Sequence, residues 1–206
     1  MTANEQITAE HAHPARCQQC HKPLESPLYC AACHQLYPAD GLDYFSLLGT
    51  SPRYDVDIEL LRRRYFQIAR DVHPDRLSAS DPQHQALGLR IIAKLNEAYR
   101  VLLDPVLRAE YLLKLSAGDE TLDEKRVPPE LLAETLELRE QIEQARAAGD
   151  QNTLAELRSR IEQGHRRVLE RIAELARRLP GDAALRQELR TSLNAVRYYQ
   201  KMLAEL

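Results

Sequence analysis

The sequence predicts an all-α protein: a helical hairpin, a C-terminal three-helix bundle and a small N-terminal metal-binding segment. One indication is composition, because Leu, Ala, Glu, Arg and Gln are abundant while Trp is absent and Phe occurs only twice. A second is spacing, because several long segments repeat apolar residues at three- and four-residue steps, as amphipathic helices do. The metal-binding segment is indicated by the cysteines, since all four lie near the N-terminus in two C-x-x-C pairs.

Composition and charge exclude several classes of function. Hydrophobic residues make up 44% and charged residues 29% of the chain, the balance of an ordinary folded protein. The formal net charge of -3 gives no general attraction to nucleic acid or to an anionic membrane. No apolar run reaches membrane-spanning length, and the first residues show neither a signal-peptide nor a transit-peptide pattern. We therefore expect a cytoplasmic protein with no nucleic-acid partner and no membrane partner.

The first 40 residues divide into two parts. Residues 1–16 are polar and unpatterned, and we expect a disordered tail. Residues 17–40, here called the cysteine segment, carry two C-x-x-C knuckles joined by a short Pro-containing loop, an arrangement that can hold a structural Zn²⁺ tetrahedrally. Because the segment is too short for a core of its own, the metal would supply most of its folding free energy. The expected ligands are Cys17, Cys20, Cys30 and Cys33.

Other uses of the cysteines are weighed against zinc. Disulfides are disfavoured in a reducing cytoplasm. A redox-active C-x-x-C normally accompanies a βαβ pattern, which is missing around both pairs. A nucleic-acid-binding zinc ribbon would need a larger basic footprint than Arg16 and Lys22 provide. An iron centre or a redox role remains open beside structural zinc.

Residues 41–115 read as a short helix followed by a helical hairpin. The short helix ends at Gly49, and two longer helices then present facing apolar stripes. Pro74 must end the first of these near Val72, because its ring lacks an N–H and disfavours helical geometry in the preceding residue. The polar triplet His73, Pro74 and Asp75 is therefore expected at the exposed tip of the hairpin.

After a polar linker, residues 116–129, the pattern of residues 130–206 predicts three further helices. Gly149 and Asp150 end the first, and Pro180, Gly181 and Asp182 supply a stop, a turn and an N-cap after the second. Short connections of this kind favour an antiparallel bundle. Gly164 is unfavourable in the interior of a helix, so the second helix could bend at this position.

Residues 43–111 resemble a J domain, the module that stimulates the ATPase of DnaK-type chaperones. The resemblance rests on the short helix at 43–49, on the His73-Pro74-Asp75 triplet, and on Asp104-Pro105 followed by Arg108-Ala109-Glu110-Tyr111. It implies that the chaperone contacts the triplet and a basic helix face. The implied chaperone-binding residues are His73, Pro74, Asp75, Arg62, Arg63, Tyr65, Arg70 and Arg76.

The second helix departs from the family at two positions. Many J domains carry basic residues where this chain has Phe66 and Gln67. This difference suggests a specialised chaperone partner rather than the general one.

A J domain followed by a helical bundle resembles the HscB family of co-chaperones for iron–sulfur cluster assembly. Two segments of the bundle carry this resemblance, Leu136-Glu137-Leu138-Arg139-Glu140 and Val196-Arg197-Tyr198-Tyr199. The resemblance implies a protein that is not an enzyme, whose bundle binds the scaffold protein IscU and delivers it to the chaperone HscA. The implied client-binding residues are Leu132, Leu136, Glu137, Glu140 and Tyr198.

Two questions stay open at the level of sequence. Leucines on an amphipathic helix are usually buried, so Leu132 and Leu136 could equally belong to the core of the bundle. Ala133 and Gln144 also depart from the residues common in the family, which could alter affinity. The alternative function is a zinc or thiol-redox protein that uses its helical parts as a scaffold.

Overall fold

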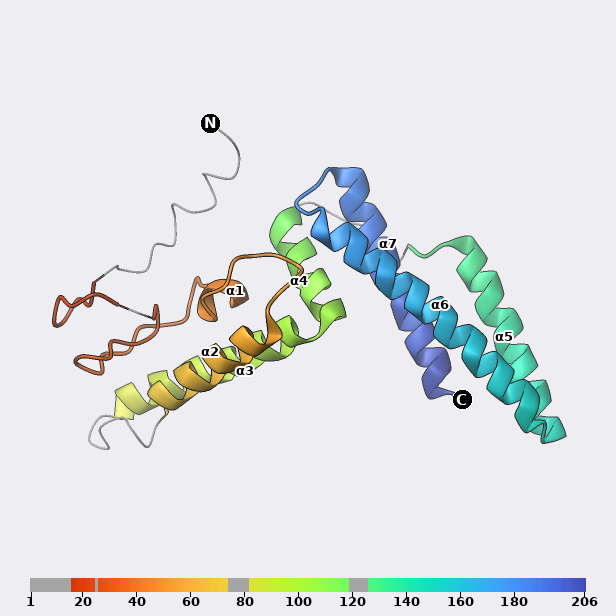
Figure 1. Ribbon diagram of the computed structural model, residues 1–206, viewed down its shortest axis with the longest axis horizontal. Coiled ribbons are helices and arrows are strands. Elements are labelled where there is room, and N and C mark those ends of the chain that lie inside the picture. The colour runs from red at the N-terminus through yellow and green to blue at the C-terminus, as the bar shows by residue number, and fades with distance from the viewer. Residues whose placement is uncertain (1–15, 25, 74–81, 119–125) are drawn as a thin grey trace. The chain divides into compact units, whose positions relative to one another are not determined.

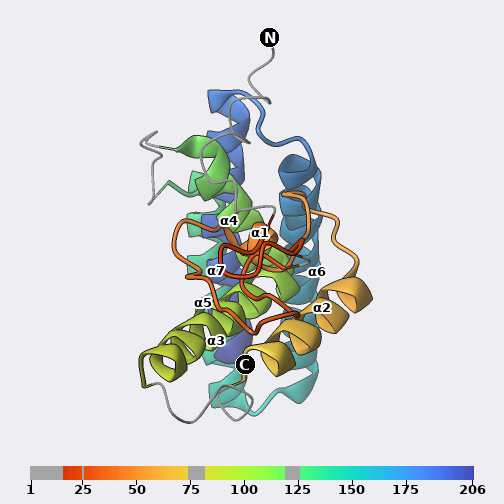
Figure 2. The same ribbon diagram turned by 90° about the vertical axis from the view of Figure 1, so that its left-hand side faces the viewer.

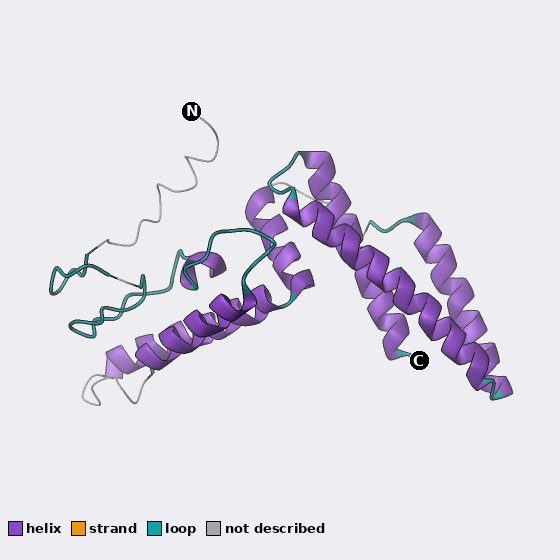
Figure 3. Ribbon diagram, viewed as in Figure 1, coloured by secondary structure: helices purple, strands orange, loops and turns teal. Residues whose placement is uncertain are grey.

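A computed structural model describes residues 16–24, 26–73, 82–118 and 126–206. Within these residues the chain forms seven α-helices (Figure 3), and the only β-type pairings are isolated bridges between residues 16 and 36. The predicted all-α class is confirmed. No described helix combines the length and apolarity needed to cross a membrane.

The order of the helices along the chain can be followed in Figure 1. Aspartates cap four of them at the N-terminus, where each carboxylate accepts hydrogen bonds from the free backbone N–H groups of the first turn. The second helix ends with Val72 as its C-cap, as Pro74 predicts. The bounds are α1 Tyr44–Leu47, α2 Ile58–Asp71, α3 Pro82–Leu103, α4 Pro105–Ala117, α5 Pro129–Ala148, α6 Gln151–Arg177 and α7 Ala183–Ala204.

The chain divides into two compact units, split after Asp104. The first contains the cysteine segment and α1–α3, and the second contains α4–α7 together with residues 53–55. In the first unit α1 and α2 both pack against α3. The buried side chains of this unit include Phe45, Leu47, Leu48, Leu61, Val72, Ile91, Leu95, Ala98 and Leu102.

In the second unit α6 and α7 form the most extensive helix pair, and α4 and α5 pack against both. Figure 2 shows this unit from another side. The contact of α4 with α6 and α7 adds a helix to the three that the sequence assigned to the bundle. Glu110 of α4 ties the helix to α7, because its Oε1 accepts from Arg190 Nη1 at 3.0 Å and from Arg197 Nη2 at 2.7 Å. The core of α5–α7 is built by Leu131, Leu138, Ile142, Leu157, Ile161, Ala195, Tyr199 and Met202.

Gly164 does not interrupt α6, which runs as one helix across the position where the sequence suggested a bend. Instead it lets two helices approach closely. A Cβ at this position would lie 2.5 Å from Cε1 and 2.8 Å from Cζ of Tyr199 on α7. The missing side chain is therefore a packing requirement of the α6–α7 pair.

Candidate functional site

The two knuckles of the cysteine segment are built alike. In the first, the Cys17 backbone N–H donates to Lys22 O at 2.8 Å and His21 N–H donates back to Cys17 O at 2.9 Å. The second repeats this pattern with Cys30, Gln35 and His34. His21 and His34 both take left-handed backbone conformations, with φ of 59° and 62°. These two histidines shape the turns, and neither belongs to the group of candidate metal ligands.

The knuckles bring the four predicted ligands together. The sulfurs of Cys17, Cys20, Cys30 and Cys33 all lie within 4.8 Å of one another. The Cys17–Cys33 and Cys20–Cys30 Sγ pairs are 3.5 and 3.6 Å apart, far longer than the roughly 2.05 Å of a disulfide. A tetrahedral ion with metal–sulfur bonds of about 2.3 Å places its sulfurs about 3.8 Å apart. The cluster thus fits a metal ion bound by four thiolates.

A tyrosine that sequence reasoning missed supports this cluster. Tyr37 donates its hydroxyl to Cys17 Sγ at 3.1 Å and accepts the Gln18 backbone N–H at 2.8 Å. Its ring is buried against Cys17 and Cys30. The only signal in the sequence is its place four residues after the last cysteine, which does not reveal the contact.

Hydrogen bonding sets the charge of the cluster. Burial raises the pKa of the Cys17 thiol, but hydrogen bonds from the Tyr37 hydroxyl and from the backbone at Cys20 and Gln19 lower it from 9.0 to a net value of about 6. For Cys33, the backbone hydrogen bond at Gln35 lowers the pKa, while burial and hydrogen bonds with the other thiols raise it to about 12. The hydrogen bonds to Cys17 therefore favour its thiolate form, which is the form that binds a metal ion.

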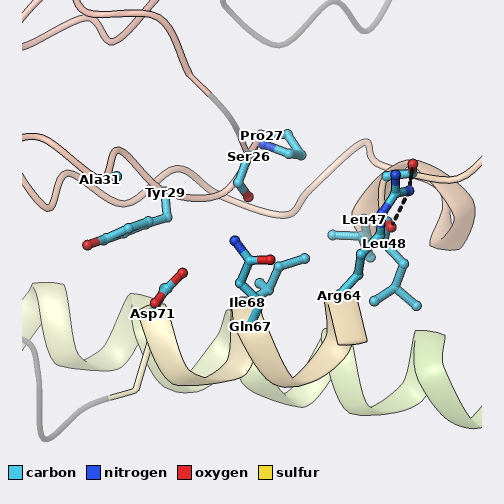
Figure 4. A pocket seen from close by; sticks show the side chains of 11 residues that line it. Ser26, Pro27, Tyr29, Ala31, Leu47, Leu48, Arg64, Gln67, Ile68 and Asp71 are labelled. Carbon is cyan, nitrogen blue, oxygen red and sulfur yellow. Dashed lines mark hydrogen bonds between the residues drawn. The ribbon is translucent and has the colours of Figure 1, made fainter. Parts of the chain in front are cut away.

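The second candidate site is α2, which presents three different sides. Leu61 and Val72 are buried at the α2–α3 hairpin. Gln67 and Asp71 point towards the cysteine segment across a pocket that Ser26 and Tyr29 line from the other side (Figure 4). The remaining side, here called the solvent face, is exposed and consists of Arg62, Arg63, Phe66 and Arg70.

The fourth arginine of α2, Arg64, does not belong to the solvent face. Arg64 turns towards α1 and donates Nη1 to the Leu48 carbonyl at 3.2 Å and to the Gly49 carbonyl (Figure 4). It therefore caps the end of α1 and adds no charge to the solvent face.

The structure places some of the expected chaperone-binding residues. Arg62, Arg63 and Arg70 are exposed on one side of α2, and His73 is exposed just beyond its C-cap. Tyr65 packs instead against α3, where it stacks on Tyr99 with ring centroids 4.2 Å apart. The other three expected residues, Pro74, Asp75 and Arg76, lie outside the described residues.

The third candidate site lies on α5. Leu132 and Leu136 are 41% and 69% exposed, whereas Leu131 and Leu138 are buried in the bundle. Glu137 and Glu140 are exposed on the same helix, and Leu132, Leu136 and Glu140 follow one another at one-turn spacing. These four residues, Leu132, Leu136, Glu137 and Glu140, form what we call the docking strip. Tyr198 lies on α7, half-buried against the core of the bundle.

The short helix, the hairpin and the exposed His73 define the first unit as that of a J-domain protein, and comparison with known proteins agrees. Residues 43–111 match the DnaJ domain, and residues 127–206 match the HSCB C-terminal oligomerisation domain. A co-chaperone protein HscB homolog of Bordetella petrii is 32% identical over 79% of this chain and 95% of its own length. One from an Azoarcus species is 37% identical over 61% of this chain and 72% of its own.

Solved structures show the same likeness. The crystal structure of human co-chaperone protein HscB superposes with a TM-score of 0.74 at 26% identity, covering 92% of this chain and 95% of the human one. Chaperone HscB from Vibrio cholerae gives 0.64 at 25% identity, covering 80% and 94%. The chain belongs to the HscB family of co-chaperones. The expected co-chaperone function is confirmed, and the family implies an Hsp70-type chaperone as a partner.

The role of Tyr37 can be tested through metal retention. Its hydroxyl donates to Cys17 Sγ at 3.1 Å and favours the thiolate, which is the form that binds a metal ion. Tyr37→Phe keeps the ring but removes this donor, so on acidification the variant should lose its metal at a higher pH than the unmodified protein does. Metal release measured with a colorimetric chelator over a pH series gives the two midpoints. Equal midpoints would contradict the assigned hydrogen bond.

Proposed function

We propose that the protein stimulates the ATPase of an HscA-type chaperone through α2 and the His73-Pro74-Asp75 triplet, and presents to it the scaffold protein IscU. The observation that carries this proposal is the exposure of Leu132 and Leu136. Two leucines kept in solvent on a helix whose other leucines are buried serve no purpose in the fold. Because they lie in a different compact unit from α2, client binding and chaperone binding can be carried by separate surfaces.

The chemistry of the docking strip suits a protein client. Its apolar residues are bordered by the carboxylates of Glu137 and Glu140, and an apolar patch with a polar rim is the common form of a protein–protein interface. Burial of the two leucines under a partner would supply apolar area, and the acids would select partners with basic groups at matching positions. Tyr198 of α7 is included among the proposed client-binding residues because the resemblance to the HscB family implies it.

The solvent face of α2 suits the chaperone. Three exposed arginines on one side of one helix create a local positive potential on a chain whose net charge is -3. Such a potential raises the rate of encounter with an acidic surface. The triplet next to α2 would then contact the chaperone and trigger ATP hydrolysis.

For the cysteine segment we propose a structural Zn²⁺. Each C-x-x-C pair has one nearly inaccessible cysteine, Cys17 at 0% and Cys30 at 1% exposure. Thiol–disulfide exchange needs an accessible thiolate. The pKa of the buried Cys17 is lowered, whereas that of the more accessible Cys33 is raised, a combination that disfavours the alternative of a redox protein. Closed four-thiolate sites are typical of structural zinc, whose binding free energy stabilises small segments.

Replacement of His73 by Gln tests the chaperone half of the proposal. His73 is exposed beyond the end of α2, where substitutions change the free energy of unfolding by no more than about 0.5 kcal/mol. The His73→Gln variant should melt like the unmodified protein and fail to stimulate the chaperone's ATPase. Full stimulation by a normally folded variant would rule out the triplet as the trigger.

Replacement of Leu132 and Leu136 by Ala tests the client half. Affinity for IscU should fall several-fold or more, while the free energy of unfolding changes little, because neither side chain contributes to the core. Leu138→Ala is the matched control on the same helix. Leu138 is fully buried, and its truncation should cost about 2–5 kcal/mol of stability. ATPase stimulation in the absence of IscU should remain normal in the double variant; unchanged IscU affinity would exclude the strip.

Metal analysis and chelation test the proposed zinc. Protein purified under reducing conditions should contain one Zn²⁺ per chain, and Cys30→Ser should lower this content. Removal of the metal should increase amide hydrogen exchange in residues 17–40, while α5–α7 keep their protection because their core is independent of the cysteines. Loss of protection throughout the chain on chelation would show that the segment is not a separate structural element.

A further inference from the structure

Phe66 is an exposed aromatic residue for which the fold offers no explanation. Its side chain is 57% exposed, although it lies in the middle of a helix that buries Leu61. A large exposed apolar side chain on a highly charged helix is the informative kind of exception to ordinary burial. The following inference rests on the proposed chaperone-binding function and assigns Phe66 a part in it.

The helix geometry places Phe66 among the arginines. Successive residues of an α-helix are rotated by about 100°, so Arg62 and Arg70 each lie about 40° from Phe66 and Arg63 about 60° from it. All three arginines are exposed. Two acids of α2 lie near these arginines: Glu59 is two turns before Phe66, and Asp71 Oδ1 accepts from Arg70 Nε at 3.3 Å. The ring is therefore the apolar centre of a basic surface.

Aromatic contacts hold the ring in place. The rings of Phe66 and Tyr65 form a T-shaped pair with centroids 5.2 Å apart and planes at 69°. Tyr65 is itself fixed, because its ring stacks on Tyr99 of α3 and its hydroxyl donates to Asn96 Oδ1 at 2.8 Å. An aromatic side chain that is already ordered loses little conformational entropy on binding, which favours its use as a contact residue.

The other sides of α2 are occupied, which leaves the solvent face as its free surface. The hairpin core covers one side, and the cysteine segment lies over another, where Gln67 and Asp71 line the pocket with Ser26 and Tyr29 (Figure 4). A partner that uses α2 therefore meets Phe66 and its three arginines together.

We propose that Phe66 is an apolar anchor for the chaperone: it enters an apolar depression within an acidic surface of the Hsp70-type partner. The arginines match the acidic surroundings, and the ring supplies the desolvated contact at the centre. A second copy of this chain is a poor occupant, because pairing two such faces would bring the arginines against one another. Interfaces commonly depend on a central aromatic residue of this kind, with charged residues around it.

The salt dependence of chaperone binding distinguishes the contribution of the Phe66 ring from that of the arginines. Exposed charges are screened over about 8 Å at physiological ionic strength, so the contribution of the arginines should fall as salt is added. A desolvated apolar contact should persist. Phe66→Ala should therefore weaken binding by a similar factor at low and high salt, whereas Arg63→Glu should weaken it mainly at low salt.

The experiment measures binding of the full chain to the HscA-type chaperone of the same organism, over a range of salt concentrations. Phe66→Ala should raise Kd by roughly tenfold or more, the effect of losing a central aromatic contact. Phe66→Leu, which remains apolar, should retain most of the affinity. Leu89→Ala is the matched control, because Leu89 is also 57% exposed in the same unit but lies on α3; its Kd should not change.

The outcomes distinguish this inference from the function on which it rests. If the unmodified chain binds and stimulates the chaperone while Phe66→Ala binds equally well, the anchor is wrong and the proposed function stands. An equal loss in Leu89→Ala, or an effect of Phe66→Ala that disappears at high salt, would also overturn the anchor. If the unmodified chain does not bind the chaperone, the proposed function itself fails.

Discussion

The packing of α2 against α3 is the interaction on which the rest of the first unit depends. It buries Leu61 and Val72 and so fixes the rotation of α2 about its axis. Once that rotation is set, the directions of the other side chains of α2 are fixed as well. Arg64 reaches the end of α1, Asp71 faces the cysteine segment, and the solvent face is left for a partner. The same hydrophobic contact that folds the unit thus also determines which charges a partner meets.

Local rules in the sequence were sufficient for several helix boundaries and for the cluster of cysteines. Pro74 predicts the end of α2, Asp182 predicts the start of α7, and the two C-x-x-C pairs predict a cluster that the structure forms. Each of these features depends on neighbouring residues only. Helix caps, helix ends and cysteine knuckles can therefore be predicted from the local sequence alone.

Features that depend on contacts between residues far apart in the chain could not be predicted from the sequence. Leu131, Leu132, Leu136 and Leu138 are all leucines on one helix, and only the position of α6 and α7 decides which of them are buried. Likewise, the sequence suggests that Gly164 bends α6, and only the structure shows that it makes room for Tyr199 of α7. The sequence also does not show that the Tyr37 hydroxyl donates to Cys17 Sγ. The four arginines of α2 are alike in the sequence, and only the structure shows that Arg64 hydrogen-bonds to the backbone at the end of α1.

The exposure of Leu132 and Leu136 has a consequence for how the chain can evolve. Most leucines of the bundle are constrained by their neighbours, so a change at one requires compensation at another. These two lie outside the buried core cluster, so selection for folding constrains them less. They can change in step with the surface of a client while the bundle stays intact. Where a lineage lost that client, these positions would drift to polar residues first, and the core leucines beside them would remain.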